Sequence, residues 1–173
     1  MKKRSAAVNP YQSFIEGKEP MKVLASTHSR IVSLTEGLTP RQLSKRVSED
    51  KWSIYEIVGH LADVEIVHSG RCRWILFEDN PVLPAFDQAA WTEGWLREKE
   101  SFKETLERFR VLRQSQMRLF RNLRPGEFRR AGTHSERGTE QLELYILKSA
   151  GHDLNHLRQI AERREILLSG KRR

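Results

Sequence analysis

The chain has 173 residues, of which 38% are hydrophobic and 31% charged, a composition that suits one folded domain with a substantial core. No stretch approaches the roughly 20 apolar residues of a membrane-spanning helix, and no apolar segment follows the charged start as in a secretion signal. A single cysteine, Cys72, excludes an internal disulfide. We therefore expect a single domain over residues 1–173 with short basic termini, in a cytoplasmic protein without a membrane partner.

The formal net charge of +8 raises the question of nucleic-acid binding. Six of the positive charges lie in the two tails, at Lys2, Lys3, Arg4, Lys171, Arg172 and Arg173. Without them the segment 5–170 carries only +2, and it contains no helix-turn-helix, zinc-finger or base-stacking strand pattern. We expect no specific nucleic-acid partner.

The first half of the chain predicts two amphipathic helices. Apolar side chains at helical spacing mark the first over residues 20–38, and Pro40 follows its end. The second spans residues 53–77. Ser53 and Glu56 form the sequence pattern of a capping box at its start.

The second half predicts two more helices after an irregular connection. Prolines interrupt residues 78–90, a segment long enough to cross a helical bundle. A third apolar stripe covers residues 91–123, and the fourth helix starts near Thr139. No strand-like alternation competes with this pattern. The sequence therefore predicts an all-α four-helix bundle in which the long crossover lets the second and third helices run parallel.

Three histidines form the clearest candidate site. His152 and His156 are four residues apart, which places both imidazoles on one face of the fourth helix. His60 lies on the apolar face of the second helix. Three neutral imidazoles suit a divalent transition ion such as zinc, nickel or iron, and they leave coordination positions open, as catalytic sites do. The alternative for each is a core histidine whose ring nitrogens are hydrogen-bonded.

The fragment from His152 to His156 also resembles the zinc-peptidase pattern, in which a glutamate follows the first histidine. Here that position is Asp153, and no further histidine follows. The sequence therefore disfavours a peptidase. Asp153 is either a hydrogen-bond acceptor beside the metal ligands or a helical acid that faces solvent.

Other polar residues are candidates for substrate contact. Arg71 projects about 20° from His60 around the second helix, so its charge could hold an anionic substrate, and Gln159 falls at a comparable angle to His152. Arg113 interrupts the third apolar stripe. Alternatively, each arginine could bury its alkyl chain and extend its guanidinium group into water. His68 and His134 are expected at the surface.

Two stretches resemble the DinB-like superfamily of metal-binding four-helix bundles. They are Lys51–Ile54 running into His60–Asp63, and Gly138–Thr139 running through His152–Ile160. The resemblance implies an up-down-down-up helix order, metal ligands at His60, His152 and His156, and a homodimer. Relatives include thiol-dependent S-transferases, a mycothiol-dependent isomerase and many members without a known reaction, so a low-molecular-weight thiol is a further implied cofactor.

The sequence thus predicts a metal-dependent enzyme that activates water or a small thiol and acts on a small-molecule substrate, as a hydrolase or an S-transferase. The metal ligands are His60, His152 and His156, and the substrate-binding candidates are Arg71 and Gln159. The alternative is a non-catalytic helical module with a structural or regulatory ion.

Overall fold

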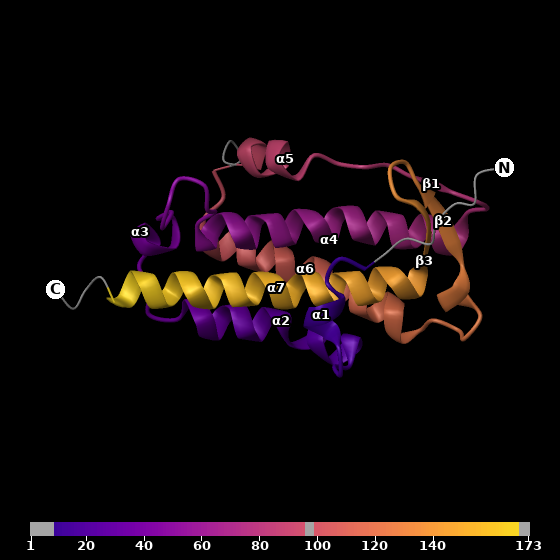
Figure 1. Ribbon diagram of the computed structural model, residues 1–173, viewed down its shortest axis with the longest axis horizontal. Coiled ribbons are helices and arrows are strands. Elements are labelled where there is room, and N and C mark those ends of the chain that lie inside the picture. Colours follow the sequence, from indigo (N-terminus) through magenta and orange to yellow (C-terminus); the bar gives the residue numbers. More distant parts are fainter. Residues whose placement is uncertain (1–8, 96–98, 170–173) are drawn as a thin grey trace.

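Four long helices lie side by side in the computed structural model, which describes residues 9–95 and 99–169 (Figure 1). The long helices are α2 (Pro20–Thr35), α4 (Ile54–Phe77), α6 (Phe102–Arg121) and α7 (Leu142–Ser169). Shorter elements join them: α1 (Gln12–Ile15), α3 (Pro40–Leu43), α5 (Gln88–Trp95), η1 (Glu127–Arg129), β1 (Val82–Leu83), β2 (Ala131–His134) and β3 (Gly138–Gln141).

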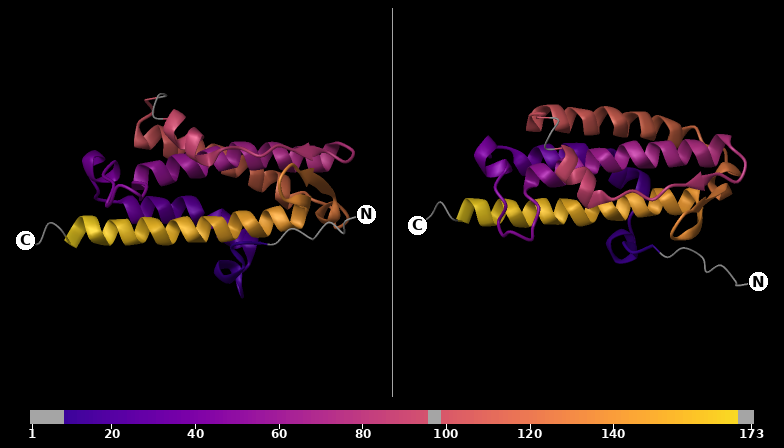
Figure 2. Two further views of the ribbon diagram at one scale, coloured as in Figure 1. Left: turned by 45° about the horizontal axis from the view of Figure 1, so that its top comes forward. Right: turned by 90° about the horizontal axis from the view of Figure 1, so that it is seen from above.

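The helix directions confirm the up-down-down-up order. In Figure 1, α4 and α6 run the same way, and α2 and α7 run the opposite way. The parallel pair requires the chain to return along the bundle between α4 and α6. The views in Figure 2 show that return as an extended segment followed by α5 along the outside of the bundle.

The start of α4 is fixed by the predicted capping box. The Glu56 backbone N–H donates to Ser53 Oγ at 3.2 Å, and the Ser53 backbone N–H donates to Glu56 Oε2 at 2.8 Å. Two orphan donors of the first helical turn are thereby satisfied. The helix ends at Phe77, as predicted.

The predicted third helix over residues 91–123 is wrong as a single element. The chain forms α5 and then α6, which begins with a second capping box between Ser101 and Glu104. The Glu104 backbone N–H donates to Ser101 Oγ at 3.3 Å, and the Ser101 backbone N–H donates to Glu104 Oε2 at 2.7 Å. Ser101 therefore starts a new helix. Residues 96–98 lie outside the described part of the chain.

A small three-stranded sheet closes one end of the bundle, and it was not predicted. β1 pairs parallel with β2, and β2 pairs antiparallel with β3. The fourth helix therefore starts at Leu142, because residues 138–141 are β3 and not its first turn. A Cβ on Gly132 of β2 would lie 2.9 Å from the Leu83 side chain. Gly132 thus lets the start of the crossover pack closely on the sheet.

The interior contains two apolar clusters with polar residues between them. One cluster, around Leu24, Ile75 and Tyr145, lies toward the sheet, and the other, around Ile57 and Leu157, lies toward the opposite end. The three candidate histidines are buried between these clusters. None of the helices in the described ranges combines the length and apolar character that crossing a membrane requires.

Candidate metal centre

His60, His152 and His156 converge in the interior. Their Nε2 atoms are close: His60 to His152 is 3.1 Å, and His156 to His152 is 3.1 Å. One ring nitrogen from each histidine lies within 4.8 Å of the others. The structure therefore brings together three residues from two helices, α4 and α7, at the positions that the sequence singled out.

Local helical geometry explains this convergence. His152 and His156 follow each other by one turn on α7, so their rings point the same way. His60 lies between the core residues Ile57 and Leu61 on α4. The apolar packing that buries α4 against α7 therefore also carries the imidazole of His60 to the other two.

Burial keeps the three imidazoles in the form that binds metals. It lowers the pKa of His60 to about 3, with a smaller contribution from the nearby His156. Burial also lowers the pKa of His156 to about 4 and that of His152 well below its usual value. Neutral rings at physiological pH need no deprotonation before they coordinate an ion.

The donor set fits a transition ion. Two nitrogens at about 2.0 to 2.1 Å from a tetrahedral zinc ion lie about 3.3 Å apart, close to the observed separations. His152 Nε2 faces the Nε2 atoms of both His60 and His156. A neutral imidazole has one N–H and one lone pair, so three ring nitrogens that face one another cannot all be paired by hydrogen bonds, whereas one cation can accept all three lone pairs. Three nitrogens suit zinc, nickel or iron(II), whereas magnesium and calcium take oxygen ligands.

Gln159 supports one of these rings and is not placed among the cavity residues. His156 Nδ1 lies 3.0 Å from Gln159 Oε1. Because an amide oxygen can only accept, Nδ1 carries the proton and Nε2 keeps its lone pair for the cluster. This contact positions the His156 ring, and the substrate contact considered for Gln159 from the sequence stays a prediction.

Aromatic side chains cover the cluster. The Trp52 ring stacks over His156 with 6.5 Å between centroids and lies 4.9 Å from His60. The Tyr11 ring meets His152 edge-on at 5.4 Å. A Cβ on Gly151 would lie 2.5 Å from Tyr11 Cβ, so only glycine allows Tyr11 to pack here.

Asp153, directly after His152 on α7, lies in a buried ionic network. It accepts from Thr27 Oγ1 at 2.6 Å and from Arg113 Nη1 at 2.6 Å. Arg113 also donates to Glu65 Oε1 at 2.9 Å. The solvent-facing alternative for Asp153 is therefore wrong, and so is the expectation that Arg113 reaches water. Burial lowers the pKa of Arg113, but the charges of Asp153 and Glu65 raise it more.

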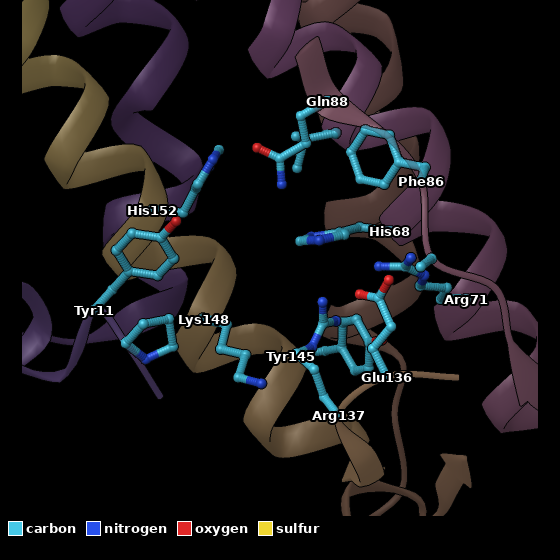
Figure 3. Close-up of a pocket in the computed structure, with 13 residues that line it drawn as sticks. Tyr11, His68, Arg71, Phe86, Gln88, Glu136, Arg137, Tyr145, Lys148 and His152 are labelled. Atoms are coloured by element: carbon cyan, nitrogen blue, oxygen red, sulfur yellow. The ribbon is translucent and has the colours of Figure 1, made fainter. Parts of the chain in front are cut away.

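A cavity of about 410 Å³ adjoins His152 (Figure 3). Arg71 forms part of its wall, as the helical projection predicted, and the crossover contributes Phe86 and Gln88 to its rim. His68 also lines it, so the predicted surface position is wrong. The missed signal is a spacing of four and seven residues from Val64 to His68 and Arg71, which puts all three on one helix face.

His134 is also buried, contrary to the prediction. Its Nδ1 accepts from the backbone N–H of Glu136 at 3.1 Å and from that of Arg137 at 3.4 Å. The ring thus supports the turn between β2 and β3. Because the sequence did not predict the sheet, nothing indicated that His134 would be buried.

Comparisons with known proteins agree with this architecture. A sequence model described as the DinB superfamily matches residues 24–160. A protein of Halalkalibacterium halodurans is 23% identical over 142 residues, 82% of each chain, and one of Bacillus subtilis is 24% identical over 148 residues, 83% of each. Both bear the name "putative metal-dependent hydrolase".

A solved four-helix bundle, YfiT from Bacillus subtilis, superimposes with a TM-score of 0.74 at 20% sequence identity. The match covers 94% of this chain and 92% of that one. At this identity the likeness concerns the fold.

Proposed function

This chain belongs to the DinB superfamily, and on that premise we propose that it is a metal-dependent enzyme that activates a small nucleophile for attack on a small-molecule substrate. His60, His152 and His156 would hold a divalent transition ion. One observation carries the proposal: three buried imidazole nitrogens meet, and one of these histidines, His152, lines a cavity large enough for a small ligand.

When bound there, zinc, nickel or iron(II) supplies Lewis acidity, which lowers the pKa of water or of a thiol and polarises an electrophile. The chain's own residues hold and shield that site. Gln159 keeps the proton of His156 on Nδ1. Trp52 and Tyr11 cover the rings with aromatic surface and limit the approach of bulk water.

His68 supplies a neutral polar group inside the cavity. Its Nδ1 lies 2.9 Å from Ser149 Oγ, and its ring points into the hollow (Figure 3). Burial and the charge of Arg71 lower the pKa of His68 to about 3, so the ring is uncharged at neutral pH. Its Nε2 is therefore suited to orienting a substrate by a hydrogen bond, not to supplying a positive charge.

The first reaction to test is hydrolysis, which the names of the relatives support. Transfer of a small thiol is the second, and its support is the family resemblance. Metal-free protein should be loaded separately with zinc, nickel and iron(II). Each form is then assayed with panels of small esters and amides and with thiols paired with electrophiles.

The matched variants are His152→Ala and His28→Ala, which remove a histidine from the cluster and one outside it. We expect metal-dependent turnover that His152→Ala loses and His28→Ala keeps. Turnover that is equal in all three proteins, or no turnover in any metal-loaded form, contradicts the proposal. Unfolding on metal removal without any turnover would instead support the non-catalytic module.

A further inference from the structure

We propose that the cavity beside His152 binds an anionic group of the substrate, a carboxylate or a phosphate, between Arg71, Arg137 and Lys148. The inference rests on the proposed function for the identity of the ligand as a substrate. The charges and contacts of the cavity wall support the anion site independently of that function.

Arg71 is a buried cation that forms no ion pair of its own with any described residue. It is 1% exposed, and no ion pair among the described residues includes it. Its Nη2 donates to the Pro84 carbonyl, its guanidinium carbon lies 5.7 Å from the Phe86 ring centre, and its buried Nε has no hydrogen-bond partner. Burying a charge in this way is costly unless an anion arrives to pair with it.

The nearby carboxylate, Glu140, already forms ion pairs with two other cations. Arg137 donates to Glu140 with Nε at 2.9 Å and Nη2 at 3.1 Å, and Lys148 donates to the same carboxylate. Burial raises the pKa of Glu140, but hydrogen bonds from Arg137 and Lys148 lower it to about 2. Glu140 is therefore ionised and fully engaged.

The charge balance leaves the cavity positive. Arg71, Arg137 and Lys148 face one buried carboxylate, Glu140, which leaves two positive charges, or one if the exposed Glu136 at the rim is counted. A phosphate dianion would neutralise two positive charges, and a carboxylate would neutralise one. The ion pairs with Glu140 account for the positive charges of Arg137 and Lys148 in the cavity wall. No ion pair within the described part of the chain accounts for the buried charge of Arg71.

The arrangement also places the anion relative to the histidine cluster. In Figure 3, Arg71 and Arg137 border the hollow on the side away from His152, and Lys148 lies between Arg137 and His152, one turn before His152 on α7. Tyr145, beside the basic residues, precedes His152 by two helical turns, or about 10 Å along α7. A fitting substrate is an extended molecule with its reactive group at one end and its anionic group at the other.

Binding can be measured without any reaction. Metal-free and metal-loaded protein are titrated calorimetrically with succinate, inorganic phosphate and the neutral isostere succinamide. The variants are Arg71→Gln and Arg137→Gln, with Arg129→Gln as the matched control, since Arg129 is exposed and lies outside the cavity. Circular dichroism checks that each variant is folded. If Arg71→Gln fails to fold, Arg137→Gln, whose side chain is 43% exposed, still provides the test.

We expect at least one anion to bind, succinamide not to bind, and the affinity to fall roughly ten- to a hundredfold in each cavity variant but not in Arg129→Gln. The preferred anion distinguishes a carboxylate from a phosphate. Equal binding of succinate and succinamide, unchanged affinity in the cavity variants, or no anion binding at millimolar concentration overturns the anion site. Anion binding by a protein that takes up no metal supports the anion site and contradicts the proposed enzyme.

Discussion

His60 Nε2 lies 3.1 Å from His152 Nε2, although the two histidines are 92 positions apart in the chain. The pair joins α4 to α7, so the folded state holds a geometry that the unfolded chain lacks. An ion that binds this pair together with His156 therefore binds the folded state preferentially.

Metal addition is expected to stabilise the protein. At an ion concentration a few hundred times the dissociation constant, binding to the folded state alone adds roughly 3 to 4 kcal/mol to the free energy of unfolding. Thermal unfolding of metal-free protein, with and without zinc or nickel, measures this. His152→Ala should lose most of the increase and His28→Ala should retain it. An equal increase in both variants would place the ion elsewhere.

Gln159→Leu is expected to weaken metal binding about 10- to 100-fold, because the variant no longer fixes the proton on His156 Nδ1. Competition with a chromogenic chelator measures the affinity. Gln114→Leu, which changes an exposed glutamine on α6, is the control and should bind metal like the unmodified chain. Anion binding in the cavity should be the same in both variants. Unchanged metal affinity in Gln159→Leu would refute the positioning role.

Gly151→Ala is expected to displace Tyr11, whose Cβ and carbonyl oxygen would lie 2.5 and 2.9 Å from the added methyl group. The overpacking should lower the free energy of unfolding by about 1 to 3 kcal/mol, measured by urea denaturation. Gly70→Ala is a matched change within α4, where the nearest atoms lie 3.9 Å away. It should raise stability by up to about 1 kcal/mol, since alanine favours helix more than glycine. The same sign for both variants would contradict the packing argument.

Arg113→Met is expected to destabilise the fold by about 3 to 5 kcal/mol, because it leaves Glu65 and Asp153 buried without their cation. Arg110→Met on the same helix breaks the more exposed pair with Glu107 and should cost far less stability, because solvent screens a surface ion pair. Chemical denaturation of both variants gives the comparison. Similar losses would mean that the buried network contributes no more than a surface ion pair.

Stability is expected to fall in acid partly through Glu140. Its pKa lies below the ordinary 4.5, at about 2, so the ionised form is favoured in the folded protein. The corresponding stability is fully present above about pH 4.5 and is lost as the pH falls toward 2. Glu140→Gln should be less stable than the unmodified chain at pH 7, with a difference that shrinks below pH 4.5. Glu143→Gln, at an exposed position on α7, should show no such convergence.

The histidine cluster was predictable because its information is local. A separation of four residues places His152 and His156 on one face, and the capping box at Ser53 sets the start of the helix that carries His60. The break before α6 has an equally local signal: Ser101 and Glu104 form a capping-box pattern, and residues 97–101 are all polar or charged, but the prediction joined the two helices.

The surroundings of the cluster depend on contacts between distant segments. Arg113 joins Glu65 and Asp153 from three different helices, and no spacing along one helix encodes that meeting. The strands have only two to four residues, too few for alternation to reveal them. The buried position of His134 follows from that sheet.

The helix order also has a consequence for biosynthesis. The first long helix, α2, packs against the last, α7, and α7 carries two of the three clustered histidines. A nascent chain that has released α2, α4 and α6 from the ribosome still lacks the helix that packs against α2 and α4. It also lacks the means to sequester an ion. Chelation capacity should therefore arise in one late step, when α7 docks, and a translating polypeptide should not compete with finished proteins for scarce cellular metal.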